Sequence, residues 1–484
     1  MLGGLKAMIR NWLNIQEAPN RDIIIQERFN FETNAIKNEI WMRGDPYEIE
    51  QFYKQMDGSE TLFWASVPYI KIRKIHTGIP QLIVKCLTSI VLNDLNDVEL
   101  SQRQLDWDNI EHDNGFKKVL KQAIQKALYL GDGAFKLSIV PSVTPYPIIE
   151  FYGANKVDIK YTRGRFKECV FKTRYTHDKK TYTLLESYGF GYVSYELHDH
   201  LDRIVSLNTI PQTEMLQNVI FSKDFCMAVP LMIYESSKWE HRGRSIFDGK
   251  ESDFDAIDEV FSQWMDALRA SRPQKYIPKV LLPRDPNTGY VENLNDFDNR
   301  FIQTESDMSE NGKNDIRLIQ PTIPSGNYLE SYITALDACL QGIISPSTLG
   351  IDVKKLDNAE AQREKEKTTL YTRNDIIVAL QECLPKLVNA TLKAYDTARS
   401  LPLQNDVEVS ISFGEYANPS FEAVVETISK ARTNKLMSIE AMIDELYGDT
   451  KDEEWKHKEI ERIKSELGIA EVDEPLIENV GDFN

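Results

Sequence analysis

The sequence predicts a helix-rich α+β fold, and three patterns lead to that class. Apolar residues recur every three or four positions over 252–270 and again over 327–342, which predicts two amphipathic helices. A third helical pattern runs from 357 to 399, whereas globular helices average only about 11–12 residues. Between 147 and 222 apolar residues alternate with polar ones, which predicts an antiparallel β-meander. The helix predicted over 357–399 is so long that we expect it to pack against a large domain or assembly.

Capping residues set the helix boundaries in the N-terminal third. Residues 45–48 (Asp-Pro-Tyr-Glu) place an N-cap aspartate, a proline at the first helical position and a glutamate two residues later. Residues 78–80 (Gly-Ile-Pro) open another helix. The apolar pattern of 116–130 ends at 131–133 (Gly-Asp-Gly), where glycine tolerates the positive φ of a C-cap, and a strand follows at once.

Further segments surround the long helix. Residues 272–324 hold short apolar runs and turn residues, which predict a small β-containing excursion between the two amphipathic helices. A loop rich in helix breakers covers 344–357. Pro385 predicts a kink in the long helix, because proline removes a backbone donor and clashes with the preceding turn. Alternation over 407–413 predicts a strand, and 438–467 is helical and charged.

Composition indicates a protein that acts without a membrane span or a broad basic surface. The formal net charge of the 484 residues is -18, which argues against a free-standing protein that grips nucleic acid through clustered Lys and Arg. No apolar run is long enough for a membrane span, and no signal peptide is visible. The five cysteines form no CxxC pair, so we expect buried thiols in a reducing compartment. They are Cys86, Cys169, Cys226, Cys339 and Cys383.

One histidine cluster is a candidate metal site. His198, His200 and Asp202 approach the H-x-H-x-D-H pattern in which imidazoles and a carboxylate bind zinc in metal-dependent hydrolases. The next position is Arg203 instead of histidine, and the polar end of a hairpin is the simpler interpretation. No phosphate-binding glycine loop and no nucleophile motif is present.

Several stretches in order resemble the portal proteins of tailed double-stranded-DNA bacteriophages, of the type with a wing, stem, clip and crown. The stretches that carry the resemblance are 76–85 (HTGIPQLIVK), 127–136 (ALYLGDGAFK), 243–247 (GRSIF), 346–351 (PSTLGI) and 358–365 (NAEAQREK), followed by the long helix. No single one is diagnostic, since portals have no catalytic signature. The order of elements over nearly the whole chain carries the resemblance.

The resemblance implies an assignment for each segment. The wing would comprise 1–248, the first stem helix 249–271, the clip 272–324, the second stem helix 325–343, the tunnel loop 344–357, the long helix 358–400, a wing return strand and helix 401–433, and the crown with an acidic tail 434–484. The tail is the most acidic part, with 15 acidic and five basic residues from Glu440 onward.

The same resemblance implies a structural role without catalytic residues, cofactor or metal. The chain would form a homo-oligomeric ring, usually of twelve subunits, at one capsid vertex of the virion, after assembly in the host cytoplasm. Double-stranded DNA would pass through its channel non-specifically during packaging and ejection. The expected protein partners are the terminase large subunit, head-completion or adaptor proteins, and the major capsid and scaffold proteins. An active phage and a domesticated particle are not distinguished by sequence.

Two sets of site residues follow from this assignment. Lys354 and Lys355 are the basic residues of the expected tunnel loop, and we expect them to contact DNA phosphates. The alternative is an ion pair with Asp352 or Asp357 at a subunit interface. The expected stem residues Trp264, Met265, Tyr328 and Tyr332 would pack between subunits, and the alternative is an ordinary core within one chain.

Overall fold

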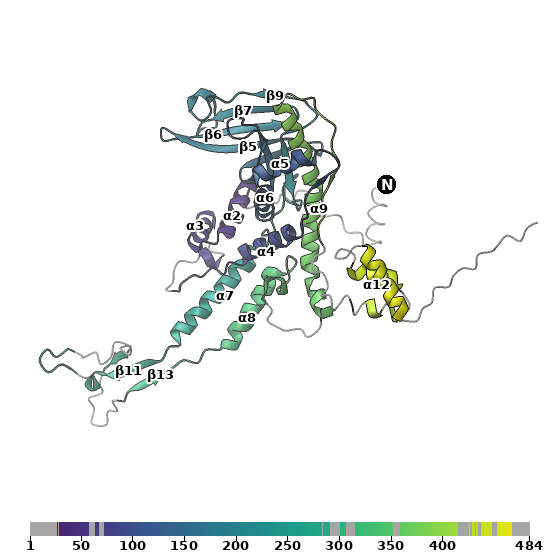
Figure 1. Ribbon diagram of the computed structural model, residues 1–484. Helices are drawn as coiled ribbons and strands as arrows, with labels where there is room; N and C mark the ends of the chain where they lie inside the picture. Colours follow the sequence, from purple (N-terminus) through teal and green to yellow (C-terminus); the bar gives the residue numbers. More distant parts are fainter. Residues whose placement is uncertain are drawn as a thin grey trace, which may run out of the picture. The chain divides into compact units, whose positions relative to one another are not determined.

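In the computed structural model (Figure 1), the chain forms two compact units, Met1–Phe413 and Gly414–Asn484. The structure describes residues 27, 29–57, 63–66, 72–282, 284–290, 301–305, 315–351, 359–414, 425, 428–430, 432–433, 437–447 and 453–466. Of residues 56–57, 66, 274, 301, 303, 359–365 and 453, it describes the backbone only. The chain mixes helices and strands, as the predicted α+β class requires.

The described part of the first unit begins with five helices, and two of them, α3 and α4, start at the predicted capping signals. Asp45 accepts a hydrogen bond from the Tyr47 N–H at 2.9 Å, and Gly78 stands in the left-handed region immediately before a proline-containing first turn. The five helices are α2 (Phe31–Arg43), α3 (Pro46–Asp57), α4 (Ile79–Asp94), α5 (Gln104–Asn114) and α6 (Phe116–Leu130).

A three-stranded antiparallel sheet follows α6. Its order is β10-β2-β3, with bounds Asp132–Ser138 for β2, Ile148–Gly153 for β3 and Ala228–Met232 for β10. Nearly every β2 residue is buried, because helix α6 contacts β2 and β3 while α9 contacts β10. Phe135 of β2 and Phe151 of β3 pack edge to face in the main core.

The predicted meander is present as a six-stranded antiparallel sheet. The order is β4-β5-β6-β7-β8, and β9 also pairs with β7. The strands are β4 (Val157–Thr162), β5 (Arg165–His177), β6 (Lys180–Gly189), β7 (Tyr192–His198), β8 (Ile204–Val205) and β9 (Val219–Ile220). One buried ion pair joins this sheet to the three-stranded one, where Lys136 Nζ lies 2.7 Å from Glu186 Oε2.

Two helices and a small sheet confirm the predicted central pattern. Helix α7 covers Glu251–Ala270 and α8 covers Ser325–Leu340, close to the expected bounds. Between them lie β11 (Gln274–Pro278), β12 (Phe301–Thr304) and β13 (Arg317–Ile319), with β11 in the centre of the three. Figure 1 shows α7 and α8 side by side, with this sheet beyond their far ends.

The long helix α9 spans Ala359–Ala398 and has 40 residues, which confirms the prediction of an unusually long helix. Buried ion pairs tie it to other helices: Arg373 Nε lies 2.7 Å from Asp94 of α4, and Asp396 pairs with Arg103 at 2.8 Å. The helix continues across Pro385, so the predicted kink of its axis stays a prediction.

The strand predicted over 407–413 is confirmed in part, because the segment pairs with residues between 95 and 101 but is a regular strand over only two residues. Only Val409–Ser410 is a strand, β14, and it pairs with the two-residue β1 (Glu99–Leu100) instead of either large sheet. The reason is that other groups take the backbone bonds. The side-chain amide of Asn389 donates to Val407 O at 3.0 Å and accepts from Val407 N at 2.7 Å, so the strand does not begin at Val407.

The second unit contains the helices α11 (Ile439–Tyr447) and α12 (Glu453–Glu466), which confirms the helical pattern expected there. They contact each other through Tyr447 and Trp455, whose rings lie 5.1 Å apart, and through a 2.8 Å ion pair between Lys456 and Asp444. Among the described helices of both units, none combines the length and apolar character that a membrane span requires.

Candidate functional site: the α7–α8 helix pair

Helices α7 and α8 run antiparallel. Lys250, before the first turn of α7, donates to the Ala338 carbonyl near the end of α8 at 2.7 Å. Further along α7, Phe261 packs on Tyr332 and Trp264 on Tyr328, so advancing along one helix means going back along the other. This arrangement follows from the sequence order, because the chain leaves α7 into the small sheet and returns from it into α8.

An aromatic cluster fills the outer part of the pair. The rings of Trp264 and Tyr328 are nearly parallel, with an interplanar angle of 2° and centroids 6.4 Å apart, and Tyr332 lies 6.4 Å from Trp264. Three of the four predicted stem residues therefore contact one another within one chain. Met265 is half-buried on the same helix. Packing of these four against a second copy stays a prediction.

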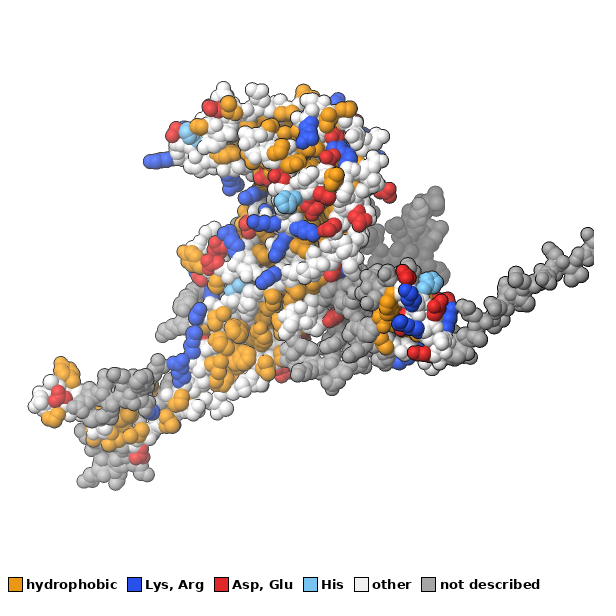
Figure 2. All heavy atoms as spheres, viewed as in Figure 1, with side chains coloured by type: hydrophobic (Ala, Val, Ile, Leu, Met, Phe, Trp, Pro, Cys, Tyr) orange, Lys and Arg blue, Asp and Glu red, His pale blue; other side chains and the backbone are white. Residues whose placement is uncertain are grey.

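The same region presents uncovered apolar surface. Leu268 on α7 is 44% exposed and Leu329 on α8 is 47% exposed, and the aromatic cluster itself is only half-buried. Figure 2 shows hydrophobic side chains gathered on this face over the two helices. Large apolar patches on a soluble protein usually mark a contact surface.

Polar side chains attach the inner half of α7 to the segments that precede α4. Asp255 accepts the backbone N–H groups of Trp64 at 2.6 Å and Ala65 at 2.9 Å. Asp258 accepts the backbone N–H and the hydroxyl of Thr77, each at 2.8 Å. Its second oxygen lies 2.7 Å from His76 Nδ1.

Ser262 completes this row, because its hydroxyl accepts the Ile75 N–H at 2.9 Å. Asp255, Asp258 and Ser262 lie along one edge of the apolar stripe of α7 and are all buried. The sequence interpretation missed their role. The available signal was the position of two carboxylates beside a buried stripe, where an acidic side chain needs hydrogen-bond donors.

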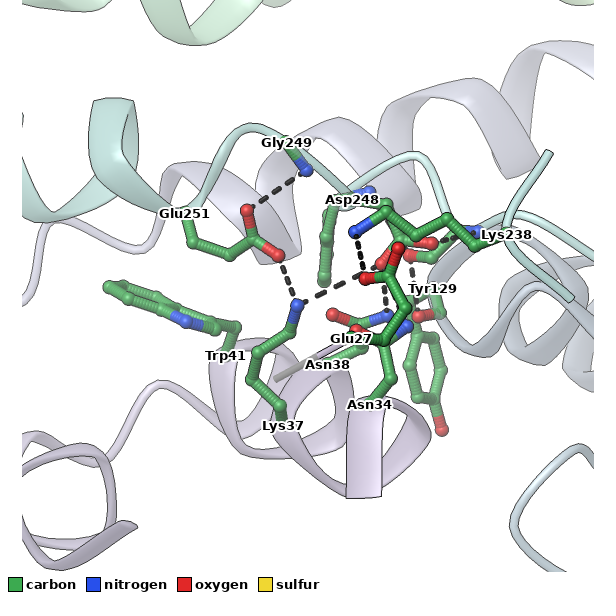
Figure 3. A network of polar contacts seen from close by, with 12 residues as sticks. Glu27, Asn34, Lys37, Asn38, Trp41, Tyr129, Lys238, Asp248, Gly249 and Glu251 are labelled. Atoms are coloured by element: carbon green, nitrogen blue, oxygen red, sulfur yellow. Dashed lines mark hydrogen bonds and ion pairs between the residues drawn. The ribbon is translucent and has the colours of Figure 1, made fainter. Parts of the chain in front are cut away.

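A second polar network holds the start of α7 against α2 (Figure 3). Asp248 Oδ1 accepts the side-chain amides of Asn34 at 2.9 Å and Asn38 at 3.0 Å. The ammonium of Lys37 bonds Glu251 and lies 3.9 Å from Asp248. The Gly249 N–H donates to the other Glu251 oxygen at 2.9 Å. Because Lys37 is buried between two carboxylates, its charge is balanced where α7 begins.

Two of the stretches that resemble portal proteins meet just before this network. A Cβ on Gly243 would lie 2.1 Å from the Gly131 carbonyl oxygen, so both positions require glycine for the backbones to cross. Asp132, fully buried, accepts Gly243 N at 2.7 Å and both the Nε and Nη2 of Arg242 at 2.9 and 3.0 Å. This crossing holds the segment that leads into α7 against the first residue of strand β2.

Threonines of α9 fix the turn that follows α8. The Thr372 hydroxyl donates to Ile343 O at 2.6 Å, and the Thr369 hydroxyl accepts Ser345 N at 2.9 Å. Thr369 also lies 2.9 Å from the Thr348 hydroxyl. The residues predicted to touch DNA, Lys354 and Lys355, lie outside the described residues, as do Asp352 and Asp357.

The histidine cluster lies at an exposed end of the meander. His198 Nδ1 lies 2.9 Å from Asp202 Oδ1, and His198 Nε2 lies 3.5 Å from Glu196. Asp199, between the two histidines, binds Arg203 instead. Within the described part of the chain, no group of three or more His, Cys, Asp or Glu side chains could hold a metal ion.

No protein-family model matches the sequence, and no characterised protein matches it by sequence. Among solved structures, the chain is similar to the neck of a native GTA particle computed with C12 symmetry, at 12% identity and a TM-score of 0.37. It is also similar to the neck of an empty GTA particle computed with C6 symmetry, at 12% identity and a TM-score of 0.39. Each match covers 80% of this chain and 91% of the other. With values this low, neither likeness establishes a function.

Proposed function

We propose that this protein is a ring-forming portal, the head-tail connector through which double-stranded DNA enters and leaves a phage-like particle. The observation that carries the proposal is the antiparallel α7–α8 pair with an exposed apolar flank, in a chain that also contains the 40-residue helix α9. Its role is structural and non-catalytic, in the virion at one capsid vertex.

The ring proposal rests on surface that one chain leaves uncovered. A helix pair normally buries its apolar stripes between the two helices and the core. Here the inner half of α7 does so, whereas Leu268 and Leu329 remain exposed beside a half-buried aromatic cluster. A neighbouring copy that supplies the same surfaces in a head-to-tail arrangement would cover this flank, and repetition around a closed axis gives a ring.

The charge of the chain suits a conduit. With a net charge of -18, the chain as a whole repels a duplex, which favours sliding of DNA over strong binding. Two adjacent lysines, Lys354 and Lys355, would make transient phosphate contacts. The sheet β11–β13 is the proposed docking surface for the terminase large subunit and later for adaptor proteins. Capsid and scaffold proteins are the partners proposed for the remainder of the ring.

The mass and image of the native protein test this function. We expect a species of twelve 55.8 kDa chains, roughly 670 kDa, with a central hole in negative-stain images. A compact dimer or tetramer without a channel would contradict the proposal. Stoichiometric zinc by elemental analysis would instead favour a hydrolase built on His198, His200 and Asp202.

Reversal of the two lysines tests the DNA contact separately. The double variant Lys354→Glu and Lys355→Glu should assemble into the same ring but package less DNA, because two added carboxylates per subunit repel phosphate. Packaging is measured as nuclease-protected DNA in assembled particles. Loss of the ring in this variant would assign the lysines to a subunit interface instead.

A further inference from the structure

Two buried carboxyl groups stand one helical turn apart on α7. Asp255 is 7% exposed and Asp258 is 8% exposed, and both face the segments that precede α4. Their partners differ in kind. Asp258 bonds the His76 ring together with the Thr77 N–H and hydroxyl, whereas Asp255 bonds only two uncharged backbone N–H groups.

Charged groups from each neighbouring element surround this pair. Helix α7 adds Glu259, whose negative charge acts on Asp255. From the segment before α4, Lys74 donates to the Ala65 carbonyl and lies 3.6 Å from Glu50 of α3. Helix α3 also carries Glu48, and Lys54 bonds Glu50. Among the described residues, no ion pair joins Asp255 to a cation, although the ammonium of Lys74 attracts this carboxylate from a greater distance.

We propose that Asp255 makes the contact between α7 and the turn at Trp64–Ser66 a proton-dependent latch, which is tighter in mild acid than at neutral pH. Two neighbouring carboxyl groups that are buried away from water cannot both ionise without a large free-energy cost. Asp258 bonds the Thr77 N–H, the Thr77 hydroxyl and the His76 ring, whereas Asp255 bonds two backbone N–H groups, so we assign the proton to Asp255. This inference does not depend on ring formation.

The direction of the pH effect follows from linkage. Burial, with smaller contributions from Asp258 and Glu259, raises the pKa of Asp255 to about 6 although two N–H groups favour the carboxylate. An exposed aspartate has a pKa of about 3.9. The folded chain therefore holds this proton more tightly than the unfolded chain does, and the contact loses stability as the pH rises from about 4 to about 6.

Replacement of the carboxyl group by an amide tests the latch. In Asp255→Asn the side chain is neutral at every pH, so the stability of the variant should not follow the protonation of residue 255. Its amide can accept only one of the two N–H groups that Asp255 accepts, so the test uses the change of stability with pH and not the stability at one pH. The pKa of Asp255 is about 6 in the folded chain and about 3.9 in the unfolded chain. The folding equilibrium constant of Asp255→Asn divided by that of wild type should therefore be about tenfold lower at pH 5 than at pH 7.5. Urea unfolding at both pH values measures the ratio.

Asp266→Asn is the matched control, because Asp266 lies on the same helix and is half-exposed. Its ratio to wild type should stay constant between the two pH values. A constant ratio for Asp255→Asn would overturn the proposal. If the amide variant does not fold, Asp255→Ser keeps a neutral acceptor and is measured in the same way. Failure of both at both pH values would show that the ionised carboxylate is required, and the latch would be wrong.

Discussion

The inner and outer halves of α7 carry the same apolar pattern but have different surroundings. In the inner half, Phe254 and Ile257 are 1% and 0% exposed, and buried polar side chains bind two other segments. In the outer half, no side chain from residue 263 to 270 is fully buried. There the aromatic rings pack mainly on α8.

This difference shows which part of the helix one chain can stabilise alone. The inner half has partners from α2, from the turn at Trp64–Ser66 and from the segment before α4, so its position is fixed by several independent contacts. The outer half has one partner helix and an open flank. Substitutions in the inner half should therefore destabilise the folded chain, whereas those in the outer half should act mainly on assembly.

The largest expected effect is at Phe254. Its ring packs on Trp41 at 5.9 Å and on Phe247 at 5.5 Å. Phe254→Ala should leave a cavity and lower the free energy of unfolding by about 3–5 kcal/mol. The outer-half control is Met265→Ala, which should cost about half as much because that side chain is only half-buried. Urea unfolding of the monomer compares the two, and equal losses would remove the distinction between the halves.

A smaller loss is expected at Asp258. Asp258→Ala removes the acceptor of the Thr77 N–H and hydroxyl and of the His76 ring. Because buried donors without a partner cost about 1–3 kcal/mol each, and water can reach some of them, the variant should lose about 2–4 kcal/mol. The neighbouring Glu259→Ala is the control, since Glu259 bonds only the exposed Gln263 among the contacts described. Similar unfolding free energies for the two variants would contradict the anchoring role.

The helices of this fold could be predicted because their signals are local. The cap at Asp45, the glycine at Gly78 and the apolar stripes of α7 and α8 lie within the segments that they shape. Strand pairing was harder. Alternation over 407–413 indicated a strand, but the pattern could not show that Asn389, on another element, would take the backbone bonds of Val407.

The polar anchors could not be predicted for the same reason. Ser252 and Asp255 have the spacing of a helix-capping pair, yet Asp255 binds a turn 190 residues away in sequence. The pair of Asp132 and Arg242 is separated by 110 residues. In both cases the residue type indicates a need for donors, while the identity of the donor depends on the tertiary fold.

The smallest effect on the folded monomer, and the sharpest test of the outer half, is expected at Leu329. At 47% exposure, Leu329→Ser should change the free energy of unfolding by no more than about 0.5–1 kcal/mol. If the proposed ring covers this flank, the same variant should raise the protein concentration needed for half-assembly, because each subunit loses apolar burial at its contact. Leu105→Ser is the control, because Leu105 is 78% exposed and lies on α5, away from the helix pair. Native mass spectrometry over a dilution series measures assembly. If wild type forms the ring and Leu329→Ser assembles equally well, the subunit contact does not lie at the outer half of the pair. That result would not contradict ring formation itself.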